Sequence, residues 1–254
     1  MKQMKIVCAV LMTMILMLSG AIISHAMETG FSTEELDKEE KQVLISSFGI
    51  SLLYSEPDKR PIDCFDVNEN GLIAIGFSDS EKKTICVYTV DGEFQYGYMF
   101  DCYGSFNLEW DKDNIIIYLV RSDAAIAVSP DGEITDTCLV SNTIENDAYR
   151  RNSLESTKRV VGDCEYIIKN DTGIFDLFAS SYSQLVVTNN GEVSIIYDVS
   201  KEQTVKIVTI FICVILFITV VISLVIREFI RLNRKQSNNT TGNKTQYDPD
   251  KNLN

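Results

Sequence analysis

The chain has 254 residues, with 36 acidic and 23 basic side chains and a formal net charge of −13. Residues 27–204 alone hold 33 acidic and 14 basic side chains, a net charge of −19. So acidic a stretch excludes binding to nucleic acid and disfavours anionic headgroups. It suits cationic partners or metal ions, or it keeps an exposed domain soluble.

Residues 1–26 read as a signal peptide. Lys2 and Lys5 precede an apolar segment, residues 6–23, and Ser24-His25-Ala26 supplies the small residues of a cleavage site. We predict cleavage after Ala26; the alternative is an uncleaved anchor, which places the following residues on the same side. Cleavage removes His25, the only histidine, and so excludes Ser-His-Asp and Cys-His catalysis and histidine metal sites.

Residues 27–49 are expected to hold an N-terminal helix. Ser32 can cap it and Glu35, three residues on, can bond back to the cap. Gly49 is a natural stop. We predict an amphipathic helix over about residues 33–47, with one apolar face formed by Leu36, Val43, Leu44 and Phe48.

In residues 50–204 the apolar residues follow the two-residue period of strands, so we predict an all-β domain there. Three hairpin glycines, Gly92, Gly132 and Gly191, follow Asp or Asn and precede Glu. They mark three four-stranded units, preceded by a strand at 50–54 and interrupted by a polar insertion at 141–159. The predicted strands are 64–67, 72–77, 84–90 and 93–100; then 105–110, 115–120, 124–129 and 133–140; then 165–169, 174–179, 184–188 and 192–199.

A four-stranded antiparallel meander of about 40 residues is typical of a propeller blade. Residues 65–75 and 108–116 resemble the strand, acidic turn, strand pattern of NHL-type and related β-propellers, and the resemblance covers roughly residues 63–200. It implies a fold and no functional residues. Three units fall short of the six or seven blades usual in such propellers, so the repeats form a partial propeller or a curved open sheet. Either leaves strand edges that need covering.

Residues 207–226 form an unbroken apolar run without charge, proline or glycine, long enough to cross a bilayer as a helix. A buried soluble helix or strand is the alternative. Arg227, Arg231, Arg234 and Lys235 follow the run, whereas Lys206 alone flanks its start. We therefore predict a single-pass cell-membrane protein with its N-terminus outside, a transmembrane helix at 205–227 and a cytoplasmic tail at 228–254.

One stretch matches the first half of a calcium-binding loop, with candidate ligands Asp66, Asn68 and Asn70 before Gly71. The twelfth position should be Glu and is Phe77, so an ordinary turn is the competing interpretation. No cofactor is indicated. The domain also holds five cysteines, for which none to two disulfides are expected: Cys64, Cys86, Cys102, Cys138 and Cys164.

The leading hypothesis is a membrane-anchored extracytoplasmic binding or assembly module without catalysis. It would act on a protein partner, or on a second copy, through exposed sheet edges or the concave face of the repeats. The alternative is a hydrolase or lyase that uses paired carboxylates on an envelope or extracellular polymer. A third is a calcium-stabilised structural protein.

Overall fold

The computed structural model describes residues 27–79 and 82–242, which form two compact units. Unit 1 comprises residues 27–169 and 181–198, and unit 2 comprises residues 170–180 and 199–242. The predicted signal peptide and the last part of the predicted tail, residues 243–254, lie outside the described residues.

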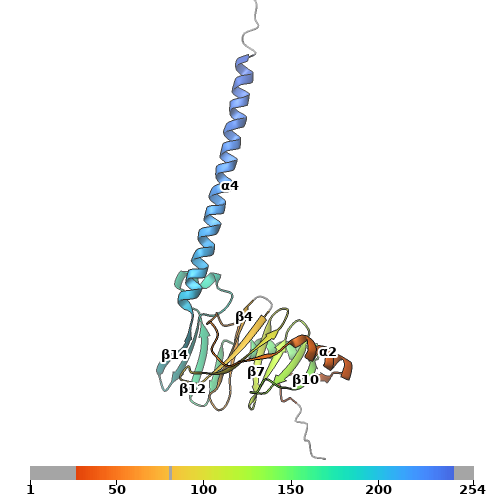
Figure 1. Ribbon diagram of the computed structural model, residues 1–254. Helices are drawn as coiled ribbons and strands as arrows, with labels where there is room; N and C mark the ends of the chain where they lie inside the picture. The colour runs from red at the N-terminus through yellow and green to blue at the C-terminus, as the bar shows by residue number, and fades with distance from the viewer. Residues whose placement is uncertain (1–26, 80–81, 243–254) are drawn as a thin grey trace, which may run out of the picture. The chain divides into compact units, whose positions relative to one another are not determined.

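Unit 1 is built from three antiparallel sheets (Figure 1). The first has the order β2-β6-β5-β4-β3 and comprises β2 (Ser51–Leu53), β3 (Cys64–Val67), β4 (Ile73–Asp79), β5 (Lys82–Tyr88) and β6 (Phe94–Asp101). The second has the order β1-β10-β9-β8-β7 and comprises β1 (Thr33–Glu35), β7 (Phe106–Asp111), β8 (Asn114–Leu119), β9 (Ala124–Val128) and β10 (Ile134–Val140). In the described part of unit 1, the sheets close into neither a barrel nor a propeller.

The third sheet differs from the sequence prediction. It runs β11-β12-β13-β14, with β11 (Lys158–Val161), β12 (Cys164–Lys169), β13 (Gln184–Asn189) and β14 (Glu192–Asp198). The prediction missed β11, which lies at the end of the polar insertion and turns into β12 through Gly162 at φ 57°. The strand predicted at 174–179 is wrong, because Gly173–Phe178 form a 3-10 helix, η2, in unit 2.

The hairpin glycines fit the turns that the sequence predicts. Gly92 and Gly132 have φ of 80° and 79°, and their N–H groups donate to Thr89 and Ser129 carbonyls at 3.0 and 2.9 Å. Both tips also join neighbouring sheets. A Cβ at Gly132 would lie 2.9 Å from Leu52 on β2, and one at Gly92 would lie 3.0 Å from the Ile196 carbonyl oxygen on β14.

The middle strands of the second sheet, β8 and β9, are buried on both faces. In β8, Ile115 and Ile117 belong to a core shared with the first sheet, whereas Ile116 and Tyr118 belong to a second cluster around Phe31. Burial on both faces explains why β8 reads as a continuous apolar run instead of an alternating one.

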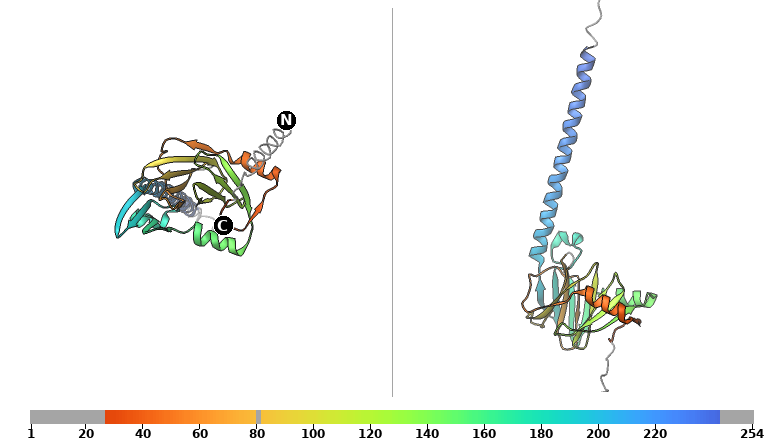
Figure 2. Two further views of the ribbon diagram at one scale, coloured as in Figure 1. Left: turned by 90° about the horizontal axis from the view of Figure 1, so that it is seen from below. Right: turned by 45° about the vertical axis from the view of Figure 1, so that its right-hand side comes forward.

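The predicted polar insertion is helical for most of its length. It forms α3 (Ile144–Tyr149), capped by the Thr143 side chain, and then a π-helical turn, η1 (Arg150–Leu154). Figure 2 shows this segment in green at the margin of the sheets, and η1 contacts both β3 and β7. The insertion therefore covers part of the unit that the open repeat would leave uncovered.

The N-terminal helix starts later than predicted. Residues 33–35 pair with β10 as β1, and α2 (Lys38–Phe48) begins at a capping box formed by Asp37 and Glu40. Gly49 ends it at φ 53°, as predicted. Leu44 packs against the core, but Val43 is exposed, so the predicted single apolar face is not formed.

Unit 2 contains η2 and the long helix α4 (Ser200–Gly242). Between Ser200 and Leu232, α4 is long and apolar enough to cross a membrane. Among the described residues, no other helix meets this criterion. The Thr209, Thr219 and Ser223 hydroxyls each donate to the carbonyl four residues earlier, at 2.8 Å. These bonds satisfy the polar groups of the run without water.

We predict that Phe48→Ala lowers the free energy of unfolding by about 3–5 kcal/mol. Phe48 is buried and stacks on Phe100, with ring centroids 4.7 Å apart, so truncation leaves a cavity under α2. Denaturant unfolding of the full chain in detergent, followed by circular dichroism, measures the loss. The exposed Val43→Ala is the control and should change stability little; equal effects of the two variants would contradict the packing of α2.

Candidate functional site

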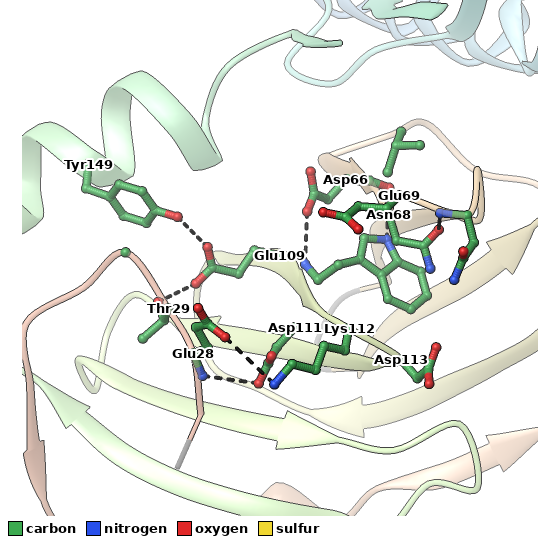
Figure 3. A pocket seen from close by; sticks show the side chains of 14 residues that line it. Glu28, Thr29, Asp66, Asn68, Glu69, Glu109, Asp111, Lys112, Asp113 and Tyr149 are labelled. Atoms are coloured by element: carbon green, nitrogen blue, oxygen red, sulfur yellow. Dashed lines mark hydrogen bonds and ion pairs between the residues drawn. The ribbon is translucent and has the colours of Figure 1, made fainter. Parts of the chain in front are cut away.

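Unit 1 contains a cleft that we call the acidic cleft (Figure 3). Its volume is about 750 Å³, and a smaller hollow of about 320 Å³ adjoins it through three shared residues, Asp66, Glu109 and Tyr149. The charged residues that line the cleft are one lysine, Lys112, and six acids: Glu28, Asp66, Glu69, Glu109, Asp111 and Asp113. The negative charge of the acidic cleft therefore favours cations and hydrogen-bond donors.

Two neighbouring edge strands from different sheets, β3 and β7, bring the cleft residues together. Asp66 lies near the end of β3, and Glu109 to Asp111 lie near the end of β7. The strands are linked by side-chain bonds: the Trp110 N–H donates to Asp66 Oδ2 at 2.9 Å, and its indole Nε1–H donates to the Asp66 carbonyl at 3.3 Å. Asp66 thus sets the spacing of β3 and β7.

Arg159 at the start of β11 ties the third sheet to Asp66. Its Nε donates to Asp66 Oδ1 at 2.7 Å, and both side chains are largely buried. The other guanidinium nitrogens donate to four carbonyls at 2.9 to 3.2 Å, and the group lies over an aromatic ring 5.1 Å from its centroid. Those carbonyls belong to Phe65, Leu154, Ser156 and Lys158. This fork of donors is one that arginine supplies and lysine cannot.

Glu109 is the buried acid of the cleft. The Thr29 hydroxyl donates to its Oε1, and the Tyr149 hydroxyl donates to its Oε2 at 2.5 Å. Burial raises the pKa of Glu109 above its ordinary value of 4.5, and the two hydroxyl donors oppose that rise. Burial also raises the pKa of Tyr149, so this hydroxyl stays a donor at neutral pH.

The calcium-loop candidates form a hydrogen-bonded turn. Asn68 Oδ1 accepts from the N–H groups of Asn70 at 3.0 Å and Leu72 at 2.8 Å, and Gly71 has φ 79°. Both oxygens of Asp66 accept bonds from Arg159 and Trp110. Over residues 27–79 and 82–242, no group of three or more His, Cys, Asp or Glu side chains could hold a metal ion.

The sequence singled out Asp66 but missed Glu109, Tyr149 and Arg159. Glu109 carried no usable signal, because in the predicted strand 105–110 it alternates with Leu108 and Trp110, and this pattern places it on the face that a half-buried strand turns to water. Arg159 and Tyr149 come from the polar insertion, where sequence pattern did not reveal which side chains turn inward.

The six described cysteines are unpaired. Burial raises the pKa of Cys86 to about 12 and that of Cys138 to about 11, and it also raises the pKa of Cys64 and Cys102. These four thiols therefore stay protonated at neutral pH and behave as apolar core groups, which disfavours thiolate chemistry at these positions.

Comparisons of the chain with family models, with curated proteins and with solved structures find no match. What the protein does must therefore be inferred from its own geometry.

We predict that Arg159→Ala lowers the free energy of unfolding by about 3 kcal/mol or more, because it leaves the largely buried Asp66 carboxylate unpaired. Arg159→Lys should restore little, since one ammonium cannot reach Asp66 and the surrounding carbonyls together. The control is Lys112→Ala, which breaks an exposed ion pair with Glu28 and should cost at most about 1 kcal/mol. Equal losses in Arg159→Ala and Lys112→Ala, measured by denaturant unfolding, would refute the role of Arg159.

Glu109 should make stability depend on pH. Its pKa is raised in the folded protein, so folding favours its protonated form. The stability it contributes is complete below its ordinary value of 4.5 and is lost as pH rises through the folded pKa. We predict that Glu109→Gln flattens this fall in a series of unfolding curves above pH 4.5. Glu28→Gln, in the same cleft but exposed, is the control; an unchanged slope in Glu109→Gln would contradict the prediction.

Proposed function

We propose that this protein is a membrane-anchored, extracytoplasmic binding module that acts through the free edge of β14 and not by catalysis. One observation supports this most strongly: the last strands of the three meanders, β6, β10 and β14, differ in whether a further strand pairs with their outer edge. β10 pairs with β1 and β6 pairs with β2, whereas among the described strands β14 pairs with β13 alone. β1 and β2 then become edge strands themselves, but each is only 3 residues long, against 7 for β14. An uncovered edge is a template for an added strand.

The composition of β14 suits strand addition. Its first four residues, 192–195, are exposed, and they include the β-branched Val193 and Ile195, which are 64% and 56% exposed. β14 contains neither lysine nor proline, the residues with which proteins usually protect an edge. The hairpin tip at Gly92 approaches the Ile196 carbonyl oxygen, so the free part of the edge is the stretch before it.

Charge favours a partner other than a second copy. Pairing two copies of β14 antiparallel about Ile195 would set Glu192 opposite Asp198 and would bring two strongly acidic domains together. A basic extended segment of another protein avoids this repulsion and gains the backbone hydrogen bonds of an added strand. We therefore propose a cationic, extended protein segment as the ligand.

The alternative function, a carboxylate-dependent hydrolase or lyase, has one observation in its favour. Asp66 and Glu109 lie in the same cleft, and their environments differ: burial raises the pKa of Glu109, whereas Asp66 is ion-paired with Arg159. Against it, each of the four carboxylate oxygens already accepts a bond from the protein. These bonds are better suited to holding the fold than to reacting with a substrate.

We also propose the architecture and topology expected from the sequence. The three meanders, each with four strands side by side in chain order, support a partial propeller related to the NHL type, in which the α3–η1 segment replaces further blades. The basic residues after the apolar run support a cytoplasmic C-terminus, and the signal-like residues 1–26 agree. The resulting location is the cell membrane, with unit 1 outside.

The test is photo-cross-linking of the full chain in its native membrane. A benzophenone amino acid at Val193 should give one dominant protein adduct, and Ile195→Pro in the same chain should abolish it by preventing strand addition. The matched control is the same amino acid at Val160, which is 63% exposed on the opposite edge strand of the same sheet and should give little adduct.

Three results would count against the proposal. Equal adducts at Val193 and Val160 would deny a special role to β14, and an adduct that survives Ile195→Pro would deny strand addition. An adduct with twice the mass of the chain would replace the cationic partner by a second copy.

A further inference from the structure

Two aliphatic side chains on η2 are placed unusually for residues in water. Ile174 is 81% exposed and Leu177 is 91% exposed, which is more than any large apolar side chain of α4 in the described residues. The turn holds them there: the Thr172 N–H and hydroxyl both donate to Asp176 Oδ1, at 2.8 and 2.6 Å. The hydrogen bonds of Thr172 and Asp176 are thus made within the turn, while Ile174 and Leu177 are left exposed.

Both η2 and α4 belong to unit 2, and they contact each other (Figure 1). The exposure of the side chains along α4 indicates where this contact lies. Gln203 is buried, and Ile207, Val208 and Phe211 are half-buried, whereas each described side chain from Ile212 to Leu232 is exposed. η2 contacts α4, and the described side chains of α4 that are at least partly buried lie between Ser200 and Phe211, so we infer that the contact is made at this level.

The half-buried residues Ile207, Val208 and Phe211 lie at the start of the uncharged run of α4. At a rise of about 1.5 Å per residue, Phe211 lies roughly 6 Å beyond Ile207, where the run begins. Amphipathic segments that lie in a membrane interface bury their apolar side about 5–10 Å into the boundary between headgroups and acyl chains. Lys201 and Lys206 are exposed beside this level and can reach lipid phosphates with their long stems.

We propose that η2 is a lipid-contacting turn, whose Ile174 and Leu177 insert at the headgroup–acyl boundary of the leaflet that α4 enters first. The occupant of this apolar surface is phospholipid, because η2 contacts α4 within one unit and the described side chains of α4 from Ile212 onward are exposed and mostly apolar. The contact would fix the depth of α4 and hold its first turns at the interface. This inference rests on the proposed membrane anchoring.

The test is tryptophan quenching by brominated phosphatidylcholine in nanodiscs that hold the full chain. Trp110, the only tryptophan, is first replaced by Trp110→Phe. Leu177→Trp is then expected to lose most fluorescence with lipids brominated near the headgroup, and less with lipids brominated near the chain ends. Ile174→Trp should behave in the same way if both side chains insert.

Two matched variants make the result decisive. Ile144→Trp, 82% exposed in unit 1, should be quenched by neither lipid, and Phe217→Trp, in the middle of the apolar run, should be quenched by the deeply brominated lipid. Quenching of Phe217→Trp with none in Leu177→Trp would overturn the inference and keep the membrane anchor. A blue-shifted, unquenched Leu177→Trp would show that protein covers the turn and would overturn it too. No quenching of Phe217→Trp would overturn the anchor and the inference together.

Discussion

The uncharged run in α4 is the constraint on which the rest of the account depends. From Ile212 onward its described side chains are exposed, and so long an apolar surface is not stable in water. A bilayer removes that surface from water, while the helix satisfies its own backbone and its three hydroxyl groups. The proposed environment of unit 1, its partner and the lipid contact of η2 all follow from this one requirement.

Within unit 1, Asp66 is the residue that connects the sheets along the cleft. Hydrogen-bonded ladders hold each sheet together but do not cross from one sheet to the next along the cleft. Asp66 makes that connection with both carboxylate oxygens, through Trp110 on β7 and Arg159 on β11. The acidic cleft is therefore best understood as the junction of three sheets. The outer edge of β14 exposes Val193 and Ile195, and η2 exposes Ile174 and Leu177, so we propose that interaction takes place at these two surfaces.

Much of the fold could be predicted from hydrophobic period and turn chemistry. β3 begins and ends at the predicted residues, and the Asp-Gly hairpins are where they were expected, because Gly at positive φ leaves a local signal. The third sheet was misassigned because residues 174–179 are mostly apolar and resemble a buried strand, although Ile174 and Leu177 are three residues apart, which is the spacing of a 3-10 helix. β11 was missed because it lies among charged residues. The helix start was misplaced because Ser32 and Asp37 both offer caps, and pairing of 33–35 with β10 decided between them. The cleft depends on long-range contacts of Arg159 and Tyr149, which no local pattern encodes.

The most direct test of the central claim is the sidedness of the chain in intact cells. Tyr54→Cys places a thiol at an exposed position of unit 1, and Gln236→Cys places one beyond the basic residues, each in a chain that carries Cys164→Ser. The account predicts that a membrane-impermeant maleimide labels the Tyr54→Cys chain in intact cells and labels the Gln236→Cys chain after permeabilisation alone. Labelling of Gln236→Cys in intact cells, with Tyr54→Cys protected, would contradict it.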